Sequence, residues 1–208
     1  RAYIDDFFYF NNTPLPKPAA YNQLIWCDEF NTSGTIDSSQ WFHQTKFPAG
    51  NSWFSGERQH YTDRFDNCFT YNGRLSITAK RETFTDQGVT KLYTSARLNS
   101  KFAFRYGRVE VRAKMTTGVG TWPAIWMLGK NINENGAYWQ TQGFGTTPWP
   151  NCGEIDIAEH WGNEPNNVFS AFHAPSTYLG GNPGGALNAG GQFISTATTD
   201  FHVYALEW

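Results

Sequence analysis

The sequence predicts an all-β protein whose antiparallel strands pack as a sandwich. Three observations support this prediction. Apolar and polar residues alternate with a period of two over several short segments. Turn-forming pairs such as Asn72-Gly73, and glycine-rich stretches, separate those segments. No segment shows the apolar spacing that an amphipathic helix requires. Successive strands without intervening helices are typical of sandwiches and barrels.

The predicted strands follow one another along the whole chain. Residues 2–10 (AYIDDFFYF) form a short β-prone run, and residues 23–30 (QLIWCDEF) predict the next strand. Residues 74–80 (RLSITAK) alternate directly after a turn. Further strands are predicted over residues 91–115, 121–128, 153–160, 167–174 and 201–208, with two or three strands in the first of these segments. We expect the glycine-rich residues 180–191 (GGNPGGALNAGG) to separate two strands.

Composition also predicts a division of the chain into parts. Three prolines within residues 11–21 favour an extended conformation and exclude helix, so we expect a linker there. Residues 1–10 would then be the tail of a preceding domain, and residues 22–208 the main domain. The alternative is that the first strand belongs to the main domain. Because the sequence stops inside an apparent strand (FHVYALEW), we expect a longer protein and a sandwich truncated at its C-terminus.

Charge and composition exclude some classes of partner. The formal net charge is −2, and the 16 Lys and Arg residues form no basic run, which argues against nucleic acid or an anionic membrane. No apolar run approaches the ~20 residues that span a bilayer. Aromatic residues make up 17% of the chain. Such a content favours an aromatic core, stacking platforms for sugar rings, or both.

The cysteines leave the redox compartment open. Cys27, Cys68 and Cys152 form neither a CxxC pair nor a spacing typical of metal ligands. One disulfide with one free thiol, or three reduced thiols, would both fit the sequence. Cysteine usage therefore does not distinguish a secreted protein from an intracellular one.

The segment GEIDIAEH places three carboxylates within six positions of a predicted strand. Alternate side chains of a strand share a face, so Glu154 and Asp156 point the same way and the intervening isoleucines point into the core. Glu159 is out of phase by one residue. A β-bulge near Ile157 and Ala158 would return Glu159 to the face of the other acids.

Three interpretations of this acidic face are open. A solvated surface is the usual place for carboxylates, but a surface strand would more often mix both signs of charge. Calcium binding would also use carboxylates, but the spacing does not match an EF-hand loop. Retaining glycoside hydrolysis needs two carboxyl groups about 5–5.5 Å apart. The Cα atoms of Glu154 and Glu159 would lie roughly 13 Å apart, at about 3.3 Å per strand step, and their side chains could converge over Asp156.

These residues resemble glycoside hydrolase family 16, over a region from about residue 22 to residue 208. The segment GEIDIAEH is similar to the bulged E-x-D-x-x-E signature of its laminarinase-like members. Supporting stretches, in the same order along the chain, are LIWCDEFN, QHYTDRFDN, YTSARLNSKFAFRYGRVEVRAKM, GTWPAIWMLG, WPNCGEIDIAEHWG and FHVYALEW. The resemblance implies a β-jelly-roll sandwich of two antiparallel sheets with a concave substrate cleft. It also implies that Glu154 is the nucleophile, Glu159 the acid/base and Asp156 an assisting carboxylate.

The resemblance also implies which side chains bind substrate. Trp122 and Trp126 would line the subsites beside the catalytic centre, whereas core packing is the alternative for either ring. Arg97 would contact sugar near the cleavage point; the alternative is a surface salt bridge. His173 matches a histidine near the catalytic strand, where a purely structural role is the alternative. Glu57 matches a loop at the edge of the cleft.

Two further features follow from resemblance alone. Many family members carry a structural calcium ion, which here implies ligands from the region of Glu29 and from the carbonyl of Gly73. The remaining expected ligand, an Asp near the C-terminus, would lie beyond this sequence. Residues 1–10 are similar to the closing strand of β-sandwich carbohydrate-binding modules that are fused to such enzymes. No cofactor is expected for catalysis itself.

The sequence therefore predicts a retaining endo-glycosidase that hydrolyses internal β-1,3 linkages of β-1,3- or mixed β-1,3/1,4-glucans. One alternative is a galactanase of the same family, acting on agar or carrageenan. A second alternative is a non-catalytic glucan-binding protein, although such relatives usually lack the catalytic glutamates. By resemblance, we expect a secreted or cell-surface monomer whose partner is its polysaccharide substrate.

Overall fold

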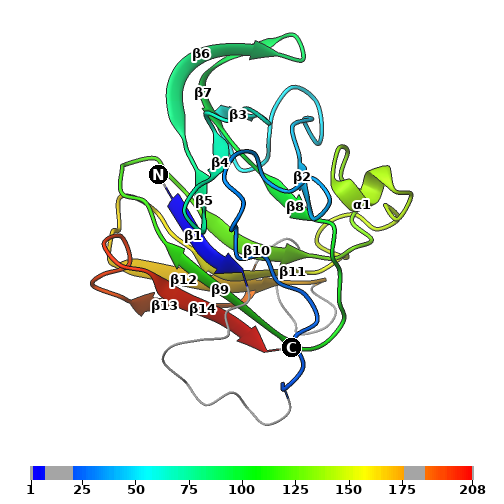
Figure 1. The fold of residues 1–208 in the computed structure, drawn as a ribbon. Coiled ribbons are helices and arrows are strands. Elements are labelled where there is room, and N and C mark those ends of the chain that lie inside the picture. Colours follow the sequence, from blue (N-terminus) through cyan, green and yellow to red (C-terminus); the bar gives the residue numbers. More distant parts are fainter. Residues whose placement is uncertain (1, 8–20, 176–185, 208) are drawn as a thin grey trace.

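Two large sheets form the body of the protein (Figure 1). The computed structural model describes residues 2–7, 21–175 and 186–207. In spatial order, the first sheet consists of β14 (His202–Glu207), β9 (Arg108–Lys114), β1 (Ala2–Phe7), β5 (Arg74–Ile77) and β4 (Cys68–Thr70). The second consists of β10 (Ala124–Leu128), β11 (Glu154–Glu159), β12 (Asn167–His173) and β13 (Ala186–Phe193). Every pairing within these two sheets is antiparallel.

Two smaller sheets extend the body. One pairs β2 (Trp41–His43) with β8 (Leu98–Ser100). The other has the order β3 (Gln59–Tyr61), β7 (Val89–Ser95) and β6 (Lys80–Asp86), and its β3–β7 pairing is parallel. The β6–β7 hairpin projects beyond the rest of the molecule (Figure 1). Within the described ranges α1 (Tyr138–Thr141) is the only α-helix, and no helix there is long and apolar enough to cross a membrane.

The core lies between the two large sheets. Alternate residues of β9 point inward, which produces its pattern of buried and half-buried positions. The β9 residues meet side chains of the second sheet in one apolar cluster, whose buried members are Val109, Val111, Ala113, Met115, Ile125, Ala158, Val168, Ala197 and Tyr204. Packing of one sheet against the other through this cluster confirms the predicted all-β sandwich.

Two segments differ from the sequence prediction. Residues 23–30 were expected to form a strand, but no strand spans them. There the Asp28 carboxylate accepts from Phe30 N (2.8 Å) and Trp41 Nε1 (2.7 Å), and Phe30 has a positive φ of 51° that a strand does not allow. The second difference is β13, which lies partly inside the glycine-rich segment expected to separate strands. A Cβ on Gly191 would lie 2.9 Å from the Phe169 ring, so glycine allows close pairing with β12.

The N-terminal run AYIDDF forms a strand, as its pattern predicts, but in the main body. Ala2–Phe7 form β1, which pairs with β5 on one side and with β9 on the other. Its backbone groups are satisfied against these two neighbouring strands, and the assignment of residues 1–10 to the tail of a preceding domain or to the main domain stays a prediction. The predicted linker lies outside the described residues except for Tyr21, so the domain boundaries stay a prediction.

The three cysteines are free thiols. Cys68 belongs to a second apolar cluster, with Phe30, Trp41 and Leu75 among its members, and burial raises the pKa of its thiol to about 12. Burial also raises the pKa of Cys152 to about 11. These thiols are protonated at neutral pH, which leaves them poor nucleophiles.

Candidate active site

The predicted bulge is present in β11 and brings the three acids to one face. In the pairing with β10, Ile125 lies opposite Ala158 and Trp126 lies opposite Asp156, so Ile157 has no partner of its own. Ala158 is fully buried in the core, whereas Glu159 pairs with Ala124. In the pairing with β12, the register likewise shifts between Asp156 and Glu159. One extra residue therefore restores Glu159 to the face of Glu154 and Asp156.

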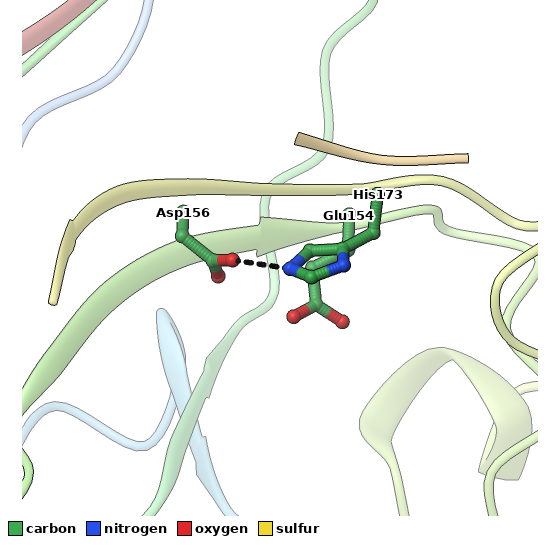
Figure 2. Close-up of side chains that lie close together, drawn as sticks. All are labelled: Glu154, Asp156 and His173. Atoms are coloured by element: carbon green, nitrogen blue, oxygen red, sulfur yellow. Dashed lines mark ion pairs between the residues drawn. The ribbon is translucent and has the colours of Figure 1, made fainter. Parts of the chain in front are cut away.

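Asp156 is the most deeply buried of the three acids. Its side chain is 4% exposed, and Oδ2 lies 3.1 Å from His173 Nε2 (Figure 2). Burial, followed by the charges of Glu154 and Glu159, raises the pKa of Asp156 to about 8. Asp156 therefore carries a proton at neutral pH. It shares a side-chain hydrogen bond with Glu154, so that proton is available to the neighbouring carboxylate.

Glu154 lies at the start of β11, where two groups support its ionised form. The indole Nε1 of Trp149 donates to Glu154 Oε2 (2.8 Å), and Asp156 provides the second hydrogen bond. Burial raises the pKa of Glu154, while His173, the Trp149 indole, Arg97 and Asp156 act in the opposite direction. Figure 2 shows the Glu154 carboxylate beside the imidazole of His173.

Glu159 lies at the other end of β11 with a different partner. The indole Nε1 of Trp122 donates to Glu159 Oε1 (2.9 Å). Burial raises the pKa of Glu159, the Trp122 hydrogen bond lowers it, and the charge of Glu154 raises it further. A raised pKa keeps a carboxyl group protonated closer to neutral pH, as a general acid requires.

The same groups also define where a metal ion could be held. Glu154, Asp156 and His173 each offer a ligand atom, and these atoms lie within 4.8 Å of one another. In the described part of the chain, no other group of three or more such residues meets this criterion. Paired carboxylates nevertheless hydrolyse glycosides without a metal ion.

Comparison with known families identifies the family of this chain. Residues 55–208 match the sequence model of the family described as Glycosyl hydrolases family 16. The chain belongs to this family. The predicted family is thereby confirmed.

Individual family 16 proteins are similar over most of the chain. A beta-glucanase of Rhodothermus marinus is 40% identical over 195 residues, which cover 91% of this chain and 60% of the relative. Glucan endo-1,3-beta-glucosidase A1 of Niallia circulans is 34% identical, covering 94% of this chain and 28% of the relative. A crystal structure of a LamA variant from Z. galactanivorans, in complex with laminaritriose and laminaritetraose, is 46% identical with a TM-score of 0.84. The aligned region covers 90% of this chain and 74% of the LamA chain.

The predicted sugar-binding residues lie beside the acids in two groups. Trp122 is 45% exposed at the Glu159 end, so it is not a core residue. Trp126 is half-buried opposite Asp156, and the guanidinium of Arg97 lies 4.8 Å from the centre of its ring. Arg97 forms a buried ion pair with Glu134 (2.8 Å), which corrects the alternative of a surface salt bridge. Sugar contacts from these residues stay predictions.

Glu57 reaches this group through aromatic rings. Its Oε2 accepts from Tyr61 Oη (2.6 Å) and Gln59 Nε2 (2.5 Å). The Tyr61 ring packs against the Trp53 ring, with 4.6 Å between their centroids. The Arg97 guanidinium, which also contacts Trp126, lies 5.4 Å from the centre of the Trp53 ring. Glu57 is therefore connected to the acidic face by a continuous row of packed side chains.

His173 and the expected calcium ligands complete the comparison with the sequence. His173 contacts Asp156, so its observed partner is the buried acid of β11; a sugar contact stays a prediction. A Cβ placed on Gly73 would lie 3.8 Å from both Glu29 O and Asn31 Oδ1. Carbonyl and amide oxygens suit calcium, which takes six to eight such ligands. Glu29 and Gly73, the ligands that the resemblance implies, would supply part of a structural site, which stays a prediction.

Sequence reasoning missed two residues of the site. Trp149 was not singled out, although the WP pair five residues before Glu154 is an aromatic signal close in sequence to the acids of β11. Glu134, which holds Arg97 and also accepts from Gln44 Nε2 (2.5 Å), lies in the segment ahead of α1. No local pattern marks that segment, so only the folded chain shows the contact.

Proposed function

We propose that this chain is the catalytic part of a retaining endo-glycosidase that hydrolyses internal β-1,3 linkages of β-1,3- or mixed β-1,3/1,4-glucans. One observation carries the proposal. Two glutamates share a face of β11 on either side of a protonated Asp156, and each accepts a hydrogen bond from a tryptophan. The names of the family 16 relatives support a β-1,3-glucan as substrate. Because the chain spans less than two thirds of those relatives, the activity of the whole protein is part of the proposal.

In the first step Glu154 attacks the anomeric carbon and Glu159 protonates the departing glycosidic oxygen. The bond from carbon to that oxygen breaks as the bond to the Glu154 carboxylate forms. Asp156 and Trp149 donate hydrogen bonds that favour the ionised form of the attacking carboxylate, against the effect of burial, which raises its pKa. The raised pKa of Glu159 keeps a proton ready for the leaving group.

In the second step a water molecule releases the sugar from Glu154. Glu159, now ionised, takes a proton from that water, which then attacks the anomeric carbon. The Trp122 indole stabilises the ionised carboxylate during this stage. Two displacements at one carbon retain its configuration.

The surroundings of the acids suit a sugar chain. Trp122 and Trp149 are 45% and 42% exposed on either side of the catalytic strand, so a ring face of each is available for stacking. We infer that Trp126, Arg97 and Glu57 extend this surface along the polymer. A polysaccharide does not cross membranes, so we also propose that the protein acts outside the cell, as a monomer.

The test is product analysis by chromatography after incubation of the full-length protein with laminarin, lichenan, agarose and carrageenan. Oligosaccharides from laminarin, alone or together with lichenan, are the expected result. NMR of the first anomer formed should show the β configuration, as retention requires. Products from a galactan only would keep the mechanism and replace the substrate. Binding of laminarin without product would make the chain a glucan-binding protein.

A further inference from the structure

The segment of residues 160–162, directly after the catalytic strand, holds the loop that carries Trp122. This loop, residues 115–123, joins β9 to β10. His160 N donates to Pro123 O (3.1 Å), and Gly162 N donates to Thr121 O (3.0 Å). In return, Gly118 N donates to Gly162 O (3.4 Å). Backbone hydrogen bonds therefore fix the loop on both sides of its tip.

Gly162 permits an approach that no other residue would allow. A Cβ at this position would lie 2.0 Å from Gly118 O and 2.2 Å from Thr121 Oγ1. Thr121 Oγ1 itself donates to Gly118 O (2.8 Å), which closes the loop. Since real Cβ atoms do not come this close to backbone oxygen, any side chain at 162 would displace the loop.

The side chains of residues 160 and 161 support the same loop. His160 is fully buried, and its ring nitrogens lie 2.8 Å from Asn167 O and 3.1 Å from Thr116 O. The ring thus joins the start of β12 to the start of the loop. The ring of Trp161 packs against Trp122, 6.1 Å between centroids. Full burial of His160 means that it contacts no substrate.

We propose that His160 and Gly162 are positioning residues for the acid/base Glu159, acting through the loop that presents the Trp122 indole. They fix the loop at the distance where Trp122 Nε1 donates to Glu159 Oε1. This inference rests on the proposed function only for its effect on catalysis. The effect on the hydrogen bond itself can be measured without a substrate.

Gly162→Ala is the decisive variant, because the added Cβ displaces the loop without altering an acid or an indole. A matched control is Gly190→Ala on β13, where a Cβ would meet nothing within 4 Å. Loss of the indole donor removes a group that stabilises ionised Glu159, so the basic limb of the pH–rate profile should move to higher pH. Turnover of laminarin should fall about tenfold, as for one charge-assisted hydrogen bond. Turnover of an aryl glycoside with a good leaving group should fall less.

A measurement without substrate keeps this test separate from the proposed function. The ¹⁵N–¹H resonance of the Trp122 indole, identified by its loss in Trp122→Phe, should move towards that of an exposed indole in Gly162→Ala. It should stay in place in Gly190→Ala. An unmoved indole resonance in folded Gly162→Ala would overturn the inference, even if the protein cleaves laminarin. A moved resonance would support it, even if laminarin is not the substrate.

Two further variants guard against misfolding and test the pathway. Thr121→Val keeps the shape of a half-buried side chain and removes its hydrogen bond to Gly118 O, so it should produce the same changes more weakly. An unchanged pH profile and indole resonance in Thr121→Val would overturn the inference if Gly162→Ala does not fold. In the Trp122→Phe background, Gly162→Ala should have little further effect on the basic limb. Full additivity would show that residue 162 acts by another route.

Discussion

The two ends of β11 surround a glutamate in different ways. At one end, Glu154 accepts from Trp149, only five residues earlier in the chain, and from Asp156, which His173 supports. At the other end, Glu159 accepts from Trp122, which a separate loop carries. The first arrangement is local and has two donors, whereas the second depends on contacts between distant segments.

This difference fits two different chemical tasks. A nucleophile has to be ionised before each turnover, and donors aimed at its carboxylate favour that form. An acid/base has to exchange its proton twice per turnover, so strong stabilisation of either form would slow one of the steps. We therefore infer that the number of donors at each end of β11 reflects the role of its glutamate.

Removal of Glu154 should have the largest effect. Glu154→Ala should lower kcat on laminarin by about 10⁴-fold or more, because the covalent intermediate can no longer form. Added azide should restore some turnover, with a product of inverted configuration, because the anion replaces the missing carboxylate. Asp200→Ala, which removes an exposed acid elsewhere, is the control and should be fully active. Normal activity of Glu154→Ala would refute the assignment.

Removal of Glu159 should have a smaller effect that depends on the substrate. Glu159→Ala should lose about 10²–10⁴-fold on laminarin, the usual contribution of a general acid. Cleavage of the first bond should be far less impaired for an aryl glycoside whose leaving group needs no protonation. Azide should here give a product of retained configuration, opposite to that from Glu154→Ala. Equal losses on both substrates would show that Glu159 is not the acid.

Sequence alone predicts the acids because their spacing is tied to the core. Ile157 and Ala158 are consecutive in sequence and both pack into the core, which requires the bulge that returns Glu159 to the acidic face. The indole donors are harder to predict. Trp122 reaches Glu159 because its loop approaches the backbone closely at Gly162. A single glycine in a sequence does not indicate which distant segment it contacts.

The pairing of strands within the sheets is also only partly predictable from the sequence. Alternation predicts β9, whose buried residues are Val109, Val111 and Ala113, but not β13, which lies partly inside a glycine-rich segment and pairs with β12 through small residues. The composition of Ala2–Phe7 does not indicate which strands they join, because strand pairing is decided by neighbours far away in sequence.

Replacement of each indole donor in turn should move a different limb of the pH–rate profile. Trp149→Phe removes a donor from ionised Glu154, so its pKa rises and the acidic limb of the kcat/KM profile moves to higher pH. Trp122→Phe does the same for Glu159, so the basic limb moves to higher pH. Each variant should lose about tenfold or somewhat more at the optimum, as for one charge-assisted hydrogen bond. Movement of the same limb in both variants would contradict the separate roles.

The smallest effect on catalysis is expected for a substitution of Asp156, which should increase the stability of the protein. Its pKa is raised from 3.8 to about 8, so between these values the folded protein keeps a proton that the unfolded chain releases. The free energy of unfolding therefore falls as pH rises through this window.

Asp156→Asn removes this loss while its amide still donates to Glu154. At pH 8 the variant should be more stable by roughly 1–3 kcal/mol, since only part of 1.36 kcal/mol per pKa unit survives relaxation around a buried group. Urea unfolding at pH 4 and pH 8 measures the difference, which should nearly vanish at pH 4; a gain of equal size at both values would show that the Asp156 proton is not its cause.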